Sequence, residues 1–123
     1  MSQKDNKAAK SFEDLWIWQE ARELAKLIYL DFADLKDYGF KDQIQRAGVS
    51  SMNNIAEGFE RDTNPEFSRF LKISKGSCGE ALSMYFLAED LSYLDSETAD
   101  KRRNKARRLS AGIASLISHL DES

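Results

Sequence analysis

Residues 12–35, FEDLWIWQEARELAKLIYLDFADL, decide the fold of this chain, because their apolar residues recur every three or four positions. That spacing places the apolar residues on one arc of an α-helix, which is typical of a helix that buries one face in a core. The arc consists of Ile17, Trp18, Ala21, Leu24, Ala25, Ile28, Tyr29, Phe32 and Leu35. Ser11 is a favourable N-cap residue, and Asp14 suits the first turn. We therefore predict a helix over residues 12–35.

Three further helices follow from the same pattern, over residues 40–58, 65–93 and 96–120. Asn64 is expected to be an N-cap residue with Pro65 at the first helical position, and Asp95 with Ser96 is expected to cap the last helix. The apolar stripe of residues 65–93 is expected to end at Leu91. Alanine and leucine each occur thirteen times, whereas valine, isoleucine and threonine together number ten. The sequence thus predicts an all-α, up-and-down antiparallel four-helix bundle.

We expect one domain over residues 12–123, preceded by a disordered polar tail over residues 1–11. Residues 1–11 lack the apolar segment of a signal peptide, and no run approaches the roughly 20 apolar residues that span a bilayer. Cys78 is the single cysteine, so no internal disulfide can form. These features favour a cytoplasmic protein without membrane contact.

The sequence predicts no catalytic residue, no metal site and no cofactor. Carboxylate-bridged metal sites in four-helix bundles need Glu-x-x-His pairs on two helices. His119 is the single histidine, and no acid lies three residues before it. Cys78 lies among small residues without a nearby histidine, so it is better interpreted as a buried small residue than as a nucleophile.

The C-terminal segment is the only part of the chain that is net basic. The chain has a net charge of −3, yet residues 101–123 carry six Lys and Arg against two acids. Cations near a helix N-terminus are disfavoured by the helix dipole, so an anion should compensate them. The candidate contacts are Lys101, Arg103, Lys105, Arg107 and Arg108. RNA or DNA phosphates are one source of the anion, and the other is the set Glu20, Glu23, Asp31 and Asp34. We favour the protein acids because the chain is net acidic and the basic stretch contains no aromatic residue.

A second candidate surface lies on the first predicted helix. Trp16, Leu27 and Leu30 project away from the core arc, and one four-helix core cannot reach both faces of this helix. Apolar residues that gather among acids are typical of interface centres, so we expect a subunit contact here. The alternative is that Trp16 lies flat over the helix end or under the N-terminal tail.

One segment resembles a known family. Residues 45–58 read QRAGVSSMNNIAEG, and they are accompanied by Phe12–Leu15 with Trp18, Phe67–Leu71, and Gly76-Ser77 with Glu80. This pattern resembles the four-helix bundle family of 23S rRNA intervening-sequence proteins, also called S23 ribosomal proteins. The chain departs from the family at residues 51–53, where isoleucine, proline and serine are usual, and at Gly48, where alanine is usual.

The resemblance implies a bundle that assembles as a homopentamer, in a family whose role is largely unassigned. The resemblance extends to accessory proteins of diversity-generating retroelements, and those proteins bind nucleic acid and a reverse transcriptase. Residues 40–58 also carry polar residues on the side opposite their apolar stripe. This pattern and the family resemblance together favour a structural or subunit-contact network over a ligand site. The residues of this network are Arg46, Asn54, Glu57, Arg61, Arg69 and Glu80.

Small residues gather in the middle of two predicted helices, at residues 47–51 and 74–81. Each glycine inside a helix costs up to about 1 kcal/mol relative to alanine, so a compensating contact is expected. We predict that residues 40–58 and 65–93 approach each other closely, or that one of them meets a neighbouring subunit.

The function that we infer from these observations is that of a non-enzymatic assembly or scaffold protein whose partner is a second copy of itself. The alternative is an RNA- or DNA-binding accessory protein that uses the basic stretch.

Overall fold

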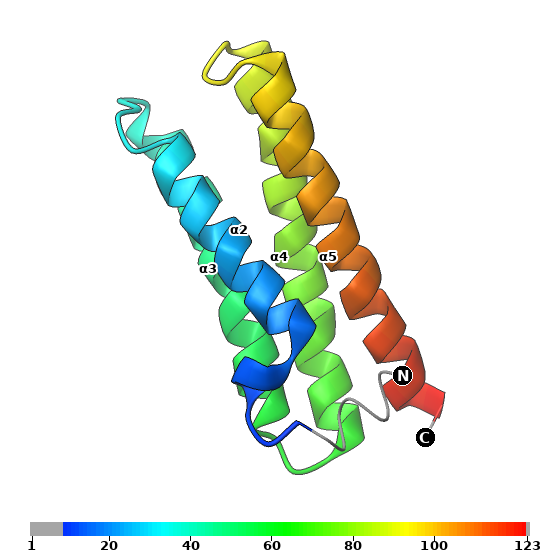
Figure 1. The fold of residues 1–123 in the computed structure, drawn as a ribbon. Helices are drawn as coiled ribbons and strands as arrows, with labels where there is room; N and C mark the ends of the chain where they lie inside the picture. The colour runs from blue at the N-terminus through cyan, green and yellow to red at the C-terminus, as the bar shows by residue number, and fades with distance from the viewer. Residues whose placement is uncertain (1–8, 123) are drawn as a thin grey trace.

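The computed structural model describes residues 9–122, and four long helices run through this part of the chain. They are α2 (Trp16–Asp31), α3 (Tyr38–Phe59), α4 (Asn64–Asp90) and α5 (Ser96–Glu122), preceded by the 3₁₀ turn η1 (Phe12–Asp14). Each long helix runs antiparallel to the one before it (Figure 1). The described residues contain no strand. The prediction of an all-α antiparallel four-helix bundle is confirmed.

The first helix is shorter than predicted. The Asp14 carboxylate accepts backbone hydrogen bonds from Lys10 (3.0 Å) and Ser11 (3.3 Å), which closes η1 as a separate turn. Leu15 is extended (φ −79°, ψ 127°) and buried, so α2 begins only at Trp16. At the other end α2 stops at Asp31, because Phe32 leaves the helical conformation and packs against Phe40 and Tyr85.

The N-termini of α4 and α5 both begin with a capping residue, and at α4 this residue differs from the predicted one. The N-cap of α4 is Thr63 and not Asn64, since the Thr63 hydroxyl accepts a hydrogen bond from the Glu66 N–H at 3.3 Å. Asp95 accepts one from the Thr98 N–H at 3.0 Å, as expected of a residue that caps α5. Residues 1–8 of the predicted tail lie outside the described residues, and Ala9 packs against the core.

The core lies along the bundle axis and takes residues from every helix. The largest fully buried apolar side chains are Tyr85, Phe32, Leu24, Ile28, Ile44, Ile55, Leu71, Leu109 and Ile113. Two residues assigned to the core arcs are about half exposed, namely Tyr29 and Leu91. Tyr29 sits at the edge of its arc, and Leu91 follows the last turn of α4, where the chain has left the helical phase.

The small residues of α3 and α4 meet as predicted. The Ser74 hydroxyl donates to the Ser51 carbonyl oxygen at 2.7 Å, and the hydroxyls of Ser50 and Ser77 lie 2.8 Å apart. Only small side chains let two helices approach closely enough for such bonds. Gly76 and Gly79 are different, because both are exposed and no atom lies within 4 Å of where a Cβ would stand.

Replacing Gly58 by alanine should destabilise the protein by about 1–3 kcal/mol, as overpacking does, despite the higher helix propensity of alanine. A Cβ at this position would lie 2.7 Å from Phe70 Cβ and 3.0 Å from Phe67 Cδ1. Gly39→Ala is the control, since its Cβ would meet only Asp37 Oδ1 at 3.9 Å. Urea unfolding of the two variants measures the difference, and equal stabilities would contradict the close contact at Gly58.

Candidate functional site

The basic segment of α5, residues 101–108, faces acids of the same chain. Arg102 binds the Asp31 carboxylate with two hydrogen bonds, from Nε at 2.7 Å and from Nη2 at 2.9 Å. The Tyr85 hydroxyl donates to the same carboxylate at 2.8 Å. Burial and the Asp31 charge raise the pKa of Tyr85, so its hydroxyl remains a donor at neutral pH. The cluster of Asp31, Tyr85 and Arg102 therefore joins α2, α4 and α5.

Two of the five predicted basic contacts are also occupied within the chain. The Arg103 side chain is 9% exposed, with Nη1 lying 2.7 Å from Glu89 Oε1. Lys105 donates to Glu20 Oε1 at 2.8 Å. Hydrogen bonds from Ser96 and then from Arg103 lower the pKa of Glu89, which keeps this carboxylate charged. Glu20 and Asp31 thus supply part of the negative charge that we predicted to compensate the basic segment.

Three cations of the segment remain exposed. Lys101 pairs only loosely with Glu97, at 3.6 Å and with both side chains in solvent. The Arg107 guanidinium lies 5.8 Å from the ring centre of Phe86, and the Arg108 guanidinium lies 5.7 Å from that of Trp16. An exposed basic surface is therefore formed by Lys101, Arg107 and Arg108 alone.

The α2 surface, which we define as Trp16, Leu27 and Leu30, lies outside the core. Leu30 is 65% exposed, Trp16 is 44% exposed and Leu27 is partly buried. One edge of the Trp16 ring packs on α5, where a Cβ added to Gly112 would lie 2.8 Å from Cζ3. Trp16 therefore partly covers the middle of α5, a contact that neither interpretation of the sequence predicted, while Leu30 is open to solvent.

The six residues expected to form a polar network make separate contacts in the described chain. Three of the contacts are ion pairs between residues close in sequence, namely Arg46–Asp42 within α3, Arg69–Glu66 within α4, and Arg61–Glu57, in which Arg61 follows the end of α3. Asn54 donates to the carbonyl and hydroxyl oxygens of Ser50, and Glu80 accepts from Gln43. Each ion pair joins residues three or four apart, which are direct neighbours on a helix surface. The ion pairs are local, but the guanidinium groups of Arg61 and Arg69 both lie over the Phe70 ring, at 4.5 and 4.7 Å from its centre. Apart from this pair, the six residues do not form one site.

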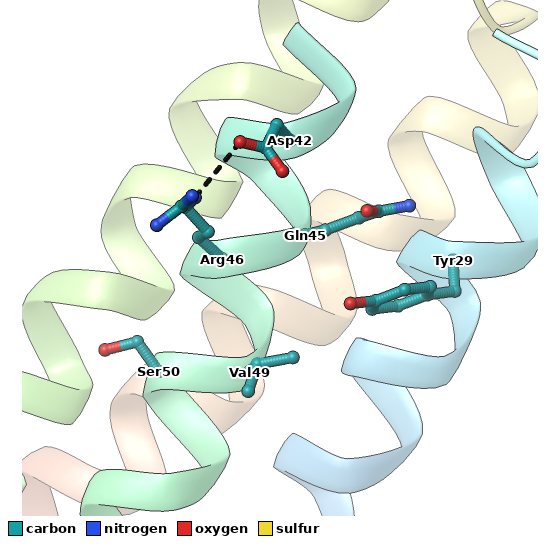
Figure 2. Close-up of a pocket in the computed structure, with 6 residues that line it drawn as sticks. All are labelled: Tyr29, Asp42, Gln45, Arg46, Val49 and Ser50. Carbon is teal, nitrogen blue, oxygen red and sulfur yellow. Dashed lines mark hydrogen bonds and ion pairs between the residues drawn. The ribbon is translucent and has the colours of Figure 1, made fainter. Parts of the chain in front are cut away.

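A shallow depression of about 290 Å³ lies between α2 and α3. Figure 2 shows Tyr29 entering it from α2, while Asp42, Gln45, Arg46, Val49 and Ser50 come from α3. Sequence reasoning missed it, because Tyr29 was assigned to the core. Arg46 is paired with Asp42 at 3.1 Å, and both side chains are largely exposed. The depression therefore offers no buried charge that could hold a ligand.

The geometry contains no activated nucleophile at Cys78. The thiol is buried and donates to the Ala106 carbonyl oxygen at 3.2 Å. Burial raises the pKa of Cys78 to about 11, so the reactive thiolate is scarce at neutral pH. Within residues 9–122, no group of three His, Cys, Asp or Glu side chains is placed to hold a metal ion. None of the helices over these residues has the length and apolar composition needed to cross a bilayer.

The fold is that of a small antiparallel helical bundle, with an apolar surface on α2 and exposed cations on α5. The family of 23S rRNA-intervening sequence proteins matches residues 13–115. The chain belongs to this family, which confirms the resemblance drawn from residues 45–58.

A solved structure shares this fold. It is the crystal structure of a protein with unknown function from the S23 ribosomal protein family of Bacteroides thetaiotaomicron VPI-5482. It superposes with a TM-score of 0.77 at 22% sequence identity, over 82% of this chain and 97% of that one. No curated protein is significantly similar to the chain. At this level of identity the likeness concerns the fold.

Replacing Asp31 by asparagine should destabilise the protein by about 2–3 kcal/mol. The change leaves Arg102 without its counter-charge in a mostly buried position, and its partial exposure keeps the loss below the 3–5 kcal/mol typical of a fully buried pair. Glu97→Gln removes an exposed partner of Lys101 and should cost less than about 1 kcal/mol. Denaturant unfolding compares the two variants. An Asp31→Asn protein as stable as Glu97→Gln would refute the role given to this cluster.

Proposed function

We propose that this protein is a non-enzymatic assembly protein whose copies associate through the α2 surface into a scaffold. The observation that carries the proposal is that Leu30 and part of Trp16 are exposed on one side of α2, next to the partly buried Leu27. Gathered apolar residues that include an aromatic ring and lie among polar groups are typical of interface centres. The family resemblance implies five copies, which would form a closed ring through head-to-tail contacts.

The charge around the α2 surface supports a protein partner. Glu20 and Asp31 are neutralised by α5, and Glu23 lies 3.4 Å from Lys26. Asp34 is exposed beyond the end of α2. The apolar centre is thus bordered by a few charges in solvent, an arrangement that excludes water from the centre and leaves the rim hydrated.

Light scattering should give the wild-type protein several times its chain mass of 14.0 kDa, and Leu30→Glu should shift that mass towards the monomer. A charge in an apolar contact must be desolvated without a partner, which weakens association. Tyr38→Glu is the matched control, since Tyr38 is 67% exposed and lies outside the α2 surface. A wild-type monomer at micromolar concentration would overturn the proposal, and a Leu30→Glu protein of wild-type mass would move the contact away from Leu30.

A second function, binding of RNA or DNA as an accessory protein, is supported by the exposed basic surface of Lys101, Arg107 and Arg108. Three exposed cations are a small footprint, because the phosphate contacts of nucleic-acid-binding proteins commonly number six to ten. Arg103 and Lys105 are engaged with Glu89 and Glu20, so this surface has lost two of its predicted members. For this reason we place assembly first.

Titration of structured RNA and of duplex DNA at two salt concentrations tests this second function. Phosphate contacts by three cations predict that the logarithm of the association constant falls with the logarithm of salt with a slope of about −2 to −3. Changing Lys101, Arg107 and Arg108 to glutamate should abolish this binding. A variant with Arg46, Arg61 and Arg69 changed to glutamate has the same net charge and should retain binding. Salt-independent binding, or an equal loss in both variants, would count against the basic surface.

A further inference from the structure

A second exposed apolar surface lies on α4. Half of the eight large hydrophobic residues that are exposed in the described chain belong to α4 or its C-cap, and α5, which has the same length, contributes none. We define the α4 surface as the exposed residues Ile73, Gly76, Gly79, Phe86 and Leu87. Within residues 9–122 these residues remain exposed, although the guanidinium groups of Arg103 and Arg107 partly cover the Phe86 ring. The family resemblance includes Gly76, and the small residues at 74–81 include Gly76 and Gly79, whereas neither feature includes Ile73, Phe86 or Leu87.

The middle of the α4 surface is flat. A Cβ added to Gly76 or Gly79 would have no atom within 4 Å, and the exposed Ser83 is the next residue along the same line. Glycine weakens a helix, and these two are not needed for packing inside the chain. Ile73 stands at one end of the flat strip, with Phe86 and Leu87 at the other, so bulky side chains of a neighbouring helix can lie between them.

The two apolar surfaces face opposite sides of the bundle. α2 packs against α3 and α5, and α4 also packs against α3 and α5. α2 and α4 are therefore diagonal to each other, and their outer faces point away from one another (Figure 1). A two-fold contact between two α2 surfaces would leave both α4 surfaces in water. A two-fold contact between two α4 surfaces would likewise leave both α2 surfaces in water. A contact of the α2 surface with the α4 surface of the next copy covers both.

The rims of both surfaces carry charges. At the Phe86 edge of the α4 surface the guanidinium groups of Arg103 and Arg107 lie 4.4 and 5.8 Å from the ring centre, and Arg103 is already paired with Glu89, so Arg107 is the exposed cation there. The α2 surface is bordered by the exposed acid Asp34, by Glu23, which pairs with Lys26, and by Arg108 over the Trp16 ring. Of the acids on the outer face of α4, Glu80 accepts a hydrogen bond from Gln43 at the α3 edge, and Asp90 lies in the last turn.

We infer that the α4 surface is the docking site for the α2 surface of a second copy of this chain, in a head-to-tail contact. The inference rests on the proposed assembly function and names the partner surface that this function requires. Trp16 and Leu30 would supply the bulky side chains, and Gly76 and Gly79 would allow the helix that carries them to approach closely.

Two variants, each defective on one surface, test the pairing. Leu30→Glu blocks the α2 surface. Gly76→Gln combined with Gly79→Gln fills the flat strip of the α4 surface, and it should leave the fold intact because both positions are open and glutamine is the better helix former. Circular dichroism and thermal melting establish that each variant is folded. Gly39→Gln is the matched control for the glutamine substitutions, since Gly39 is exposed and lies outside both surfaces.

Each variant alone should be monomeric by light scattering, whereas an equimolar mixture should give a heterodimer of twice the chain mass. The mixture retains one intact α2 surface and one intact α4 surface, which suffice for a single contact. If the glutamine variant keeps the wild-type mass, or if the two monomeric variants do not combine, the α4 surface is not the partner and the inference fails while assembly stands. A monomeric wild-type protein would instead remove the proposed function itself.

Discussion

The burial of Asp31 between Tyr85 and Arg102 is the constraint on which the rest of this structure depends. A carboxylate held away from water needs hydrogen bonds for its lone pairs, and here α4 supplies one and α5 supplies two. The bonds fix the antiparallel α2–α3 pair against the α4–α5 pair at the end of the bundle where Phe32, Phe40 and Tyr85 pack together. They also fix the end of α2, because the chain leaves the helix directly after Asp31.

The same constraint changes how the basic segment of α5 is understood. Six cations within eight residues suggest a nucleic-acid surface when only the sequence is seen. In the folded chain Arg102, Arg103 and Lys105 are turned towards Asp31, Glu89 and Glu20, so half of the positive charge stabilises contacts between helices. What faces solvent is a smaller group of cations, two of which stack on half-exposed aromatic rings at the edges of the apolar surfaces. Such cations suit contact with an acidic protein surface as well as with phosphate.

Small residues do two different things in this bundle. Ser51 and Ser74 are buried at the seam of α3 and α4, where their hydroxyls bond across the helices. Gly76 and Gly79, two and five residues beyond Ser74, are exposed, and no atom of the described chain outside their own turn of helix lies within 4 Å of where a Cβ would stand. The fold is shared with a protein that is 22% identical, at a TM-score of 0.77. Agreement in fold at that identity is expected when the pattern of apolar and small positions is retained and most other side chains differ.

The sequence by itself determined the number, order and buried faces of the helices, because the helical period sorts apolar from polar positions locally and because Asp14 and Asp95 act within a few residues of their partners. It placed Glu57 and Arg61 in one polar network, and these two do pair, but it did not indicate that Arg46 and Arg69 would pair with Asp42 and Glu66. It did not determine that Thr63 caps α4, since Thr63 and Asn64 are both suitable capping residues, nor that Tyr29 and Leu91 leave the core.

Only the tertiary structure decided which acid receives each cation of α5, because Asp31 and Arg102 lie 71 residues apart and are brought together by the packing of whole helices. Only the folded bundle placed the outer faces of α2 and α4 on opposite sides. Helix periodicity identifies the buried arc of a single helix, but it does not give the direction in which the opposite face of that helix points within the bundle.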